Sequence, residues 1–214
     1  MKYTSILFDL DGTLLDTNEL ILRTFNYTLD KVLGISLPRE QITATYGRPL
    51  SDVMAEFDPL QADVLLSTYR AYNAQIHDEY VQLFPQVRES LAALKSLGLK
   101  LAVVTSKKAD IARHGLQFFQ LEPFFDTFIG PEDTKQHKPD GEPAAEALRR
   151  LHCPAAGAIM VGDSPYDILC GQACGCETAA VRYSVHDPAA LSAVHPTYML
   201  DTLADLLPIV QATN

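Results

Sequence analysis

Short apolar runs, each followed by a turn and most by an amphipathic segment, recur along the chain. Five such runs are found at residues 6–8, 99–104, 128–129, 158–161 and 178–181. Turn residues bound each run, and apolar residues at helical spacing mostly follow it, so we expect buried strands joined by crossover helices. This alternation is typical of an α/β fold with a parallel sheet. Ligands of such sheets bind beyond the carboxyl ends of the strands, and polar residues follow most of the runs there.

Residues 18–83 depart from this alternation. They carry apolar residues at helical spacing and no convincing strand. Pro38 is predicted to lie in the first turn of a helix within this stretch. The pattern therefore predicts a core formed by residues 1–16 and 84–214. A small all-helical domain of residues 17–83 is expected to be inserted after the first strand.

The composition is typical of a globular protein, with 47% hydrophobic and 21% charged residues. The 17 basic and 27 acidic residues give a formal net charge of −10. Such a field repels the phosphates of nucleic acids and anionic membranes, so we expect neither as a partner. An anionic phosphate substrate would need a locally positive pocket, which a bound metal ion would supply best.

The chain contains no apolar run near the roughly 20 residues that a membrane helix needs. Asp9 interrupts the only apolar stretch near the N-terminus, which is too short for a signal peptide. We therefore expect a cytoplasmic protein, and nothing in the sequence indicates an obligate protein partner.

Three of the four cysteines are clustered at Cys170, Cys174 and Cys176, and the fourth is Cys153. A zinc site would usually need further paired Cys or His ligands, and the sequence offers no matching cluster. The favoured interpretation is small buried thiols in a reducing compartment, with a metal or redox role as the alternative.

Two acidic residues, Asp9 and Asp11, follow the first predicted strand. Residues two apart on a loop point in similar directions, so both carboxylates can face one site, and Gly12 lets the chain turn sharply. An ordinary Asp-Gly turn is the alternative. Two unpaired acids at the end of a buried strand are costly, however, and a divalent cation is their natural partner.

Hydroxyl and lysine side chains follow the next two strands. Thr105 and Ser106 close the second strand, where a hydroxyl and free backbone N–H groups can hold a phosphoryl oxygen. A helix N-cap would use the same two residues. Lys138 follows the third strand and supplies a compact positive charge suited to phosphate. The alternative is a solvated surface lysine.

Two further acids, Asp163 and Asp167, follow the fourth strand. Asp163 as a metal ligand, with Asp167 behind it, would suit a hard cation that keeps several waters. Asp167 could equally complement the dipole at a helix N-terminus. Four successive strands thus end in an acid pair, a hydroxyl, a lysine and a second acid pair. Together they predict one site for a phosphoryl group and a metal ion.

These four groups resemble the four signature motifs of the haloacid dehalogenase superfamily. The resemblance implies a Rossmann-like core with helices on both faces, a helical cap and Mg²⁺-dependent phosphoryl transfer. It implies that Asp9 attacks phosphorus and forms an aspartyl-phosphate. Asp11 would protonate the leaving oxygen and then deprotonate the hydrolytic water. Asp11 also favours phosphoryl transfer over dehalogenation, because the dehalogenases of the superfamily lack this second acid.

The same resemblance implies roles for the other motif residues. Thr105 and Lys138 would bind the oxygens of the transferring phosphoryl group and spread its charge in the transition state. The Mg²⁺ site would be formed by the Asp9 carboxylate, the Asp11 backbone carbonyl, Asp163 and, behind them, Asp167.

Nearly the whole chain resembles the bacterial inorganic pyrophosphatases of the haloacid dehalogenase type, for example around Tyr46-Gly47-Arg48 and Lys138-Pro139-Asp140. Gly141, where proline is expected, and the cysteine cluster depart from that pattern. Hydrolysis of inorganic pyrophosphate is the favoured function. The alternatives are a phosphoglycolate phosphatase, a sugar-phosphate mutase resembling β-phosphoglucomutase, and a catalytically silent binding protein.

Substrate specificity is expected to lie in the cap, near Gly47 and Arg48. The guanidinium of Arg48 could bind a second phosphate or a carboxylate of a small substrate. An arginine on the surface at a helix start is the alternative interpretation.

Overall fold

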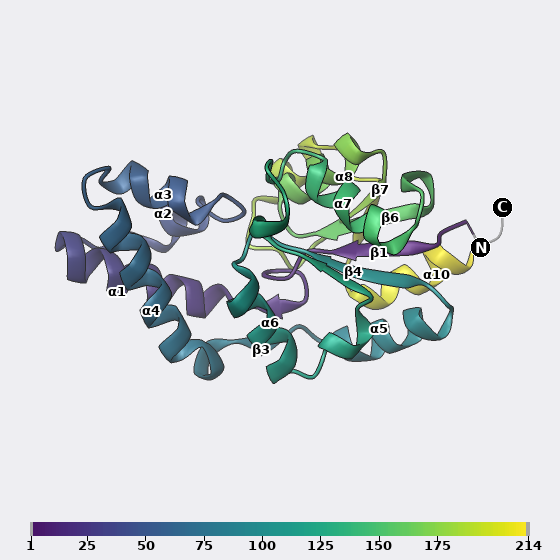
Figure 1. Cartoon of the computed structure of the whole chain (residues 1–214), viewed down its shortest axis with the longest axis horizontal. Helices are drawn as coiled ribbons and strands as arrows, with labels where there is room; N and C mark the ends of the chain where they lie inside the picture. The colour runs from purple at the N-terminus through teal and green to yellow at the C-terminus, as the bar shows by residue number, and fades with distance from the viewer. Residues whose placement is uncertain (1, 213–214) are drawn as a thin grey trace.

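A parallel sheet forms the centre of the computed structural model, which describes residues 2–212 (Figure 1). Within these residues the sheet has six strands in the order β5-β4-β1-β6-β7-β8. Their bounds are β1 Ser5–Phe8, β4 Lys100–Val104, β5 Thr127–Ile129, β6 Ala158–Gly162, β7 Glu177–Val181 and β8 Tyr198–Leu200. The predicted α/β fold is confirmed, and five strands lie where the apolar runs placed them. We did not predict β8, because two of its three residues are only half-buried and the pattern of a buried strand is missing.

Helices cover both faces of the sheet because successive strand residues point to opposite sides. Ile6 and Phe8 of β1 pack in one apolar cluster with α5 (Val87–Ser96), α6 (Ala109–Phe118) and α10 (Leu206–Gln211). Leu7, between them, packs in a second cluster with α7 (Glu142–Leu151) and α8 (Pro165–Cys174). In Figure 1 the first group lies below the sheet and the second above it. The remaining short elements are α9 (Pro188–Ala193) and 3₁₀ turns at Glu122–Phe124, Pro131–Asp133, Ala155–Gly157 and Leu203–Asp205.

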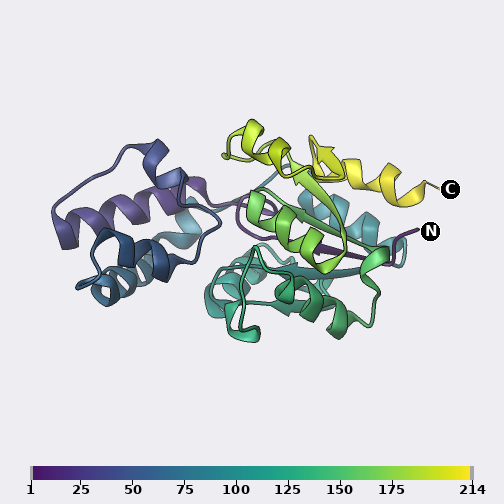
Figure 2. The same ribbon diagram turned by 90° about the horizontal axis from the view of Figure 1, so that it is seen from above.

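Four helices follow the first strand and form a body of their own beside the sheet (Figure 2). They are α1 (Asn18–Leu33), α2 (Arg39–Thr43), α3 (Leu50–Phe57) and α4 (Ala62–Tyr80). Their inward residues, among them Phe25, Met54 and Tyr69, form a separate apolar cluster. Pro38 lies directly before α2 rather than inside its first turn. In the described part of the chain, none of the helices combines the length and the apolar character needed to cross a membrane.

A short antiparallel pair joins this helical body to the core. Strand β2 (Leu15–Asp16) precedes α1 and pairs with β3 (Gln82–Leu83), which follows α4. The expectation that residues 18–83 contain no strand is therefore wrong for Gln82 and Leu83. Two-residue strands are too short for an alternating pattern, so nothing in the sequence marks them.

Helix α8 packs unusually close to the sheet at Gly171. A Cβ atom there would lie 2.6 Å from Met160 Cβ and 2.7 Å from Thr178 Cγ2. Gly171→Ala should therefore lower the free energy of unfolding by about 1–3 kcal/mol, because the helix must move off β6 and β7. Urea denaturation measures this. As a control, Leu169→Ala on the exposed side of the same helix should change it by no more than about 0.5 kcal/mol. A Gly171→Ala protein as stable as wild type would show that the helix has room to shift.

Candidate active site

The first, second and fourth motif residues converge because three neighbouring strands end at the same edge. Phe8 at the end of β1 pairs with Val103 of β4 and with Val161 of β6. Asp9 follows directly, and its backbone N–H donates to the carbonyl of Val161 at 2.9 Å. Thr105 and Asp163 follow the two partner strands, so parallel pairing sets these side chains beside Asp9.

Lys138 joins the third motif to this edge. Its ammonium donates to Asp9 Oδ1 at 2.7 Å and to Asp167 Oδ1 at 2.6 Å. All three side chains are buried, and Lys138 is only 6% exposed. A buried lysine needs such partners because an unpaired ammonium inside a protein is very costly. Lys138 is therefore a buried ion-pair partner and not a solvated surface lysine.

Asp167 serves the helix and the lysine at the same time. Its Oδ2 accepts from the backbone N–H of Ser164 at 3.0 Å and from the Ser164 hydroxyl at 2.6 Å, which forms a capping box at the start of α8. Its Oδ1 accepts from Lys138. Asp167 is therefore the helix-terminal acid that was one of the two interpretations, and it also contacts the buried lysine; its place behind a metal ligand stays a prediction.

Gly12 brings the loop after β1 against Asp163. The residue has φ +82°, and a Cβ atom would lie 2.3 Å from Asp163 Oδ2. Only glycine fits both this left-handed conformation and this close approach. The Ser184 hydroxyl donates to Asp163, at 2.6 Å to its backbone carbonyl and at 3.3 Å to Oδ2.

Three carboxylates and a single lysine are buried in this cluster, and the lysine bonds two of them. Burial raises the pKa of Asp9 to about 7, although the Lys138 ammonium acts in the opposite direction. Burial and the Asp167 carboxylate raise the pKa of Asp163 well above its ordinary value. Burial alone lowers the pKa of Lys138, but attraction to Asp167 and Asp9 outweighs it and raises that pKa. Lys138 therefore stays charged, and one positive charge cannot balance three carboxylates.

The carboxylates offer what a hard cation needs. Asp9, Asp163 and Asp167 each present an oxygen, and these oxygens lie within 4.8 Å of one another. Carboxylate oxygens are the ligands that Mg²⁺ and similar divalent cations prefer. The residues present therefore fit a divalent metal ion, whose charge would also relieve the repulsion between them.

Asp11 lies apart from these three carboxylates. Its Oδ1 accepts from the ammonium of Lys107 at 2.9 Å, and its side chain is partly exposed. Thr105 stands next to this pair and accepts from the backbone N–H of Lys107 through its hydroxyl at 3.1 Å. Lys107 was not among the residues we predicted. It belongs to the Thr-Ser-Lys-Lys segment after β4, but nothing in that segment shows which lysine turns inward.

A cavity of about 510 Å³ lies between the strand ends and the helical body. The motif residues, Ser106 included, line it from the core, and Tyr46, Gly47, Arg48 and Arg70 line it from the other side. Gly47 has φ +80°, and a Cβ atom there would lie 2.9 Å from Tyr166 Cδ2, so the loop before α3 touches the start of α8. A small anionic ligand would be enclosed by both parts of the chain.

Arg48 is bound to a residue of the helical body in this structure. Its guanidinium forms an ion pair with the carboxylate of Glu56 in α3. Arg48 lines the cavity, but its guanidinium is paired with Glu56 and would have to rotate to contact a ligand, so its role in binding stays a prediction.

The cysteines are all free thiols. Cys170 and Cys176 are buried and pack with Met160 on one face of the sheet, as predicted for small buried thiols. Cys153 and Cys174 are half-buried at the edge of the same cluster.

The strand ends of the parallel sheet carry a carboxylate cluster beside a buried lysine, and a helical body follows the first strand. This combination is typical of hydrolases of the haloacid dehalogenase type. The model of the haloacid dehalogenase-like hydrolase family matches residues 6–181. The chain belongs to this family. The predicted fold of the haloacid dehalogenase type and the predicted enzyme class, a phosphatase, are confirmed.

Individual relatives agree with this assignment. The pyrophosphatase PpaX of Bacillus velezensis is 41% identical over 97% of the chain and 96% of its own length. The structure of a haloacid dehalogenase-like family hydrolase from Streptococcus pneumoniae is 28% identical, with a TM-score of 0.88, and covers 98% of this chain and 99% of its own. A structure from Haemophilus somnus described as a predicted phosphoglycolate phosphatase is 25% identical, with a TM-score of 0.86, and covers 99% of each chain.

The imbalance of charge predicts opposite effects for two similar substitutions in metal-free protein. Asp163→Asn should raise the free energy of unfolding by about 1–3 kcal/mol in EDTA at neutral pH, because it removes one of the crowded buried carboxylates. Asp167→Asn should lower it by about 1–3 kcal/mol, because Asp167 holds Lys138 and caps α8. Calorimetric unfolding measures both. If Asp163→Asn destabilises the metal-free protein as much as Asp167→Asn, the carboxylates do not repel one another as described.

Proposed function

We propose that the protein hydrolyses inorganic pyrophosphate to phosphate through an aspartyl-phosphate formed on Asp9. The observation that carries the proposal is the Lys138 bridge between Asp9 and Asp167 in the wall of the cavity. It holds a buried carboxylate at the end of a central strand, where a phosphoryl group can reach it. The 41% identity to a pyrophosphatase supports the choice of substrate.

In the first half of the reaction, a carboxylate oxygen of Asp9 attacks the terminal phosphorus. The bond between that phosphorus and the bridging oxygen breaks, and Asp11 gives a proton to the leaving phosphate. Lys138 and the Thr105 hydroxyl bind oxygens of the group in transfer, with Ser106 beside them, and spread its charge. Asp167 keeps Lys138 in place throughout.

In the second half, Asp11 takes a proton from a water molecule that attacks the phosphorus of the aspartyl-phosphate. The P–O bond to Asp9 breaks, phosphate leaves and the Asp9 carboxylate is restored. Lys107, which contacts Asp11 at 2.9 Å, keeps this acid turned toward the cavity. The carboxyl group of Asp11 thus serves as acid and then as base.

Mg²⁺ is the proposed cofactor. The Asp9 carboxylate, Asp163 and the Asp11 backbone carbonyl would hold it, with Asp167 behind them. When bound, the ion would neutralise charge on the phosphoryl oxygens and on the crowded carboxylates. This explains how a chain with a net charge of −10 can accept an anionic substrate.

Residues 17–83 are proposed to act as a cap domain on a core of residues 1–16 and 84–214. The β2–β3 pair is the connection between the two, so it would carry any opening of the cavity. The cap would choose the leaving group, with Gly47 allowing close approach and Arg48 meeting the second phosphate. The substrate is thus a small phosphate compound, and the proposed location is the cytoplasm. The similarity to a protein described as a predicted phosphoglycolate phosphatase favours phosphoglycolate as the second candidate substrate.

Asp9→Asn should lower kcat by several orders of magnitude, because an amide of nearly the same shape cannot attack phosphorus. Turnover of pyrophosphate and of phosphoglycolate with Mg²⁺ is the measurement, and circular dichroism checks the fold. Asp110→Asn, on the exposed surface of α6, is a matched control that should keep wild-type activity. A folded Asp9→Asn enzyme with a tenth of wild-type turnover would remove Asp9 from its proposed role.

The ion pair of Arg48 with Glu56 gives a second prediction. Arg48→Ala should lower kcat/KM for pyrophosphate, with a loss of about 2–4 kcal/mol of transition-state stabilisation. It should affect much less an aryl phosphate whose aryl group is uncharged, because that group offers Arg48 no second anion. Glu56→Gln should have the opposite effect on pyrophosphate and lower its KM, because it frees the guanidinium. Steady-state kinetics with both substrates measures this. Equal losses of Arg48→Ala on the two substrates would contradict a role in binding the leaving phosphate.

A further inference from the structure

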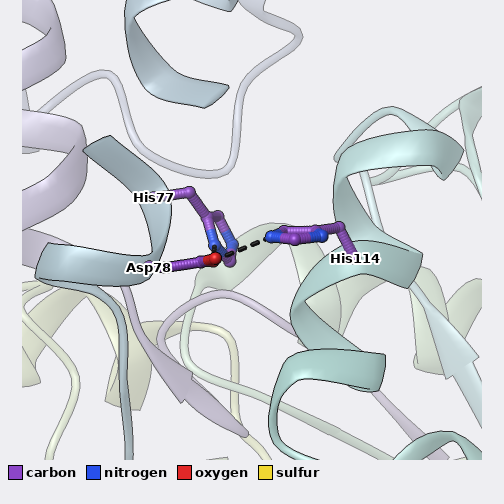
Figure 3. Close-up of side chains that lie close together, drawn as sticks. All are labelled: His77, Asp78 and His114. Atoms are coloured by element: carbon purple, nitrogen blue, oxygen red, sulfur yellow. Dashed lines mark hydrogen bonds and ion pairs between the residues drawn. The ribbon is translucent and has the colours of Figure 1, made fainter. Parts of the chain in front are cut away.

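Two histidines and an aspartate meet on the side of the molecule where α4 lies against α6 (Figure 3). His77 and Asp78 belong to the last turn of α4, and His114 lies on α6. Asp78 Oδ1 lies 2.8 Å from His77 Nδ1 and 2.7 Å from His114 Nε2. A single carboxylate oxygen therefore stands between two imidazole nitrogens from different parts of the chain.

The cluster has one buried side chain, that of His77, and two that solvent can reach, those of Asp78 and His114. His77 is only 1% exposed, and its ring packs edge-on against that of His114, with 4.9 Å between the ring centres. Gly115 of α6 lies directly against this histidine, because a Cβ atom on it would be in van der Waals contact with His77 Nε2 at 3.4 Å. The side chains of Asp78 and His114 are each about half exposed, so an ion can reach them from solvent.

We propose that His77, Asp78 and His114 bind a late first-row divalent cation such as Zn²⁺, Co²⁺ or Ni²⁺. Two imidazole nitrogens and one carboxylate oxygen, with a further position open to water, are a donor set that these ions favour. Ligand atoms around a tetrahedral ion at about 2.0–2.1 Å stand roughly 3.3 Å apart. The contacts of 2.7 and 2.8 Å to Asp78 would each lengthen by roughly 0.5 Å, and the two imidazole nitrogens, which lie within 4.8 Å of each other, would move to a similar separation.

The position of the cluster also favours a cation. His77 and Asp78 lie at the C-terminal end of a 19-residue helix, where the helix dipole is negative. This site differs in chemistry from the carboxylate cluster around Asp9, since Mg²⁺ prefers oxygen ligands and binds imidazole weakly. Excess Mg²⁺ should therefore occupy the carboxylates and leave the histidines to the other ion.

An ion bound here would join α4 of the helical body to α6 of the core. His77 and Asp78 precede β3, one of the two segments that connect these parts. Coordination would add bonds between them without touching the cavity that holds the substrate. The expected consequence in the isolated protein is a higher unfolding temperature when the ion is present.

The test is a titration of untagged protein with Co²⁺ in a large excess of Mg²⁺, followed by visible absorption. Four-coordinate Co²⁺ bound by nitrogen absorbs far more strongly than Co²⁺ in an all-oxygen octahedral site. Wild-type protein should bind one such ion per chain, and Zn²⁺ should displace it and raise the unfolding temperature. His114→Ala and Asp78→Asn should weaken binding at least about tenfold. Both residues are half exposed, so the variants are expected to fold.

His152→Asn is the matched control, because His152 is an exposed histidine at the end of α7 and asparagine suits its left-handed backbone. It should bind Co²⁺ like wild type. Asp163→Asn should also retain the absorbing ion, which separates this site from the proposed Mg²⁺ site. The proposal is overturned if wild type shows no strong absorption, or if His114→Ala gives the same spectrum and affinity as wild type.

Discussion

The ammonium of Lys138 between Asp9 and Asp167 is the interaction on which the rest of the site depends. It connects the loop after β1 with the segment after β5 and with the first turn of α8. Because all three groups are buried, their hydrogen bonds are strong and the cost of losing one partner is high. The lysine therefore fixes the nucleophile in place and at the same time ties the start of α8 to the edge of the sheet.

The same cluster gives the physical reason for the proposed divalent cation. Asp163 is pressed against Gly12, and none of the lysines that the structure describes donates a hydrogen bond to it, since Lys138 donates to Asp9 and Asp167. A protein selected for stability alone would not keep a third buried carboxylate there. Its presence makes sense where a divalent ion and a phosphoryl group occupy the adjacent cavity. A divalent ion and Lys138 would together offset the three carboxylates, so the loaded site would no longer repel an anionic substrate.

Much of the fold followed from the sequence, because the central strands are buried on both faces and appear as uninterrupted apolar runs. The strands β2, β3 and β8 carry no such run and could not be found in this way. The convergence of Asp9, Thr105 and Asp163 followed from parallel strands alone. By contrast, the pairing of Asp11 with Lys107 and of Arg48 with Glu56 depends on side-chain directions after a turn, which one sequence does not contain.

Gly141 and the cysteine cluster, the two departures from the pattern of the pyrophosphatases, are neighbours in space. A Cβ atom on Gly141 would lie 2.9 Å from the backbone of Ala173 and Cys174. The glycine before α7 therefore leaves room for the end of α8, where the cysteine cluster lies. Neither feature takes part in the hydrogen bonds that hold the carboxylates of the site, so the two form a local packing arrangement that one sequence does not reveal.

The central claim is that Asp9, held by Lys138, forms a covalent bond to phosphorus. Borohydride reduces an aspartyl-phosphate to homoserine, so it can trap the intermediate during turnover of pyrophosphate with Mg²⁺. Peptide mass spectrometry of the quenched enzyme should then find homoserine at position 9, and only when the substrate is present. Homoserine at position 11, 163 or 167, or no modified peptide in an enzyme that is turning over, would contradict the account.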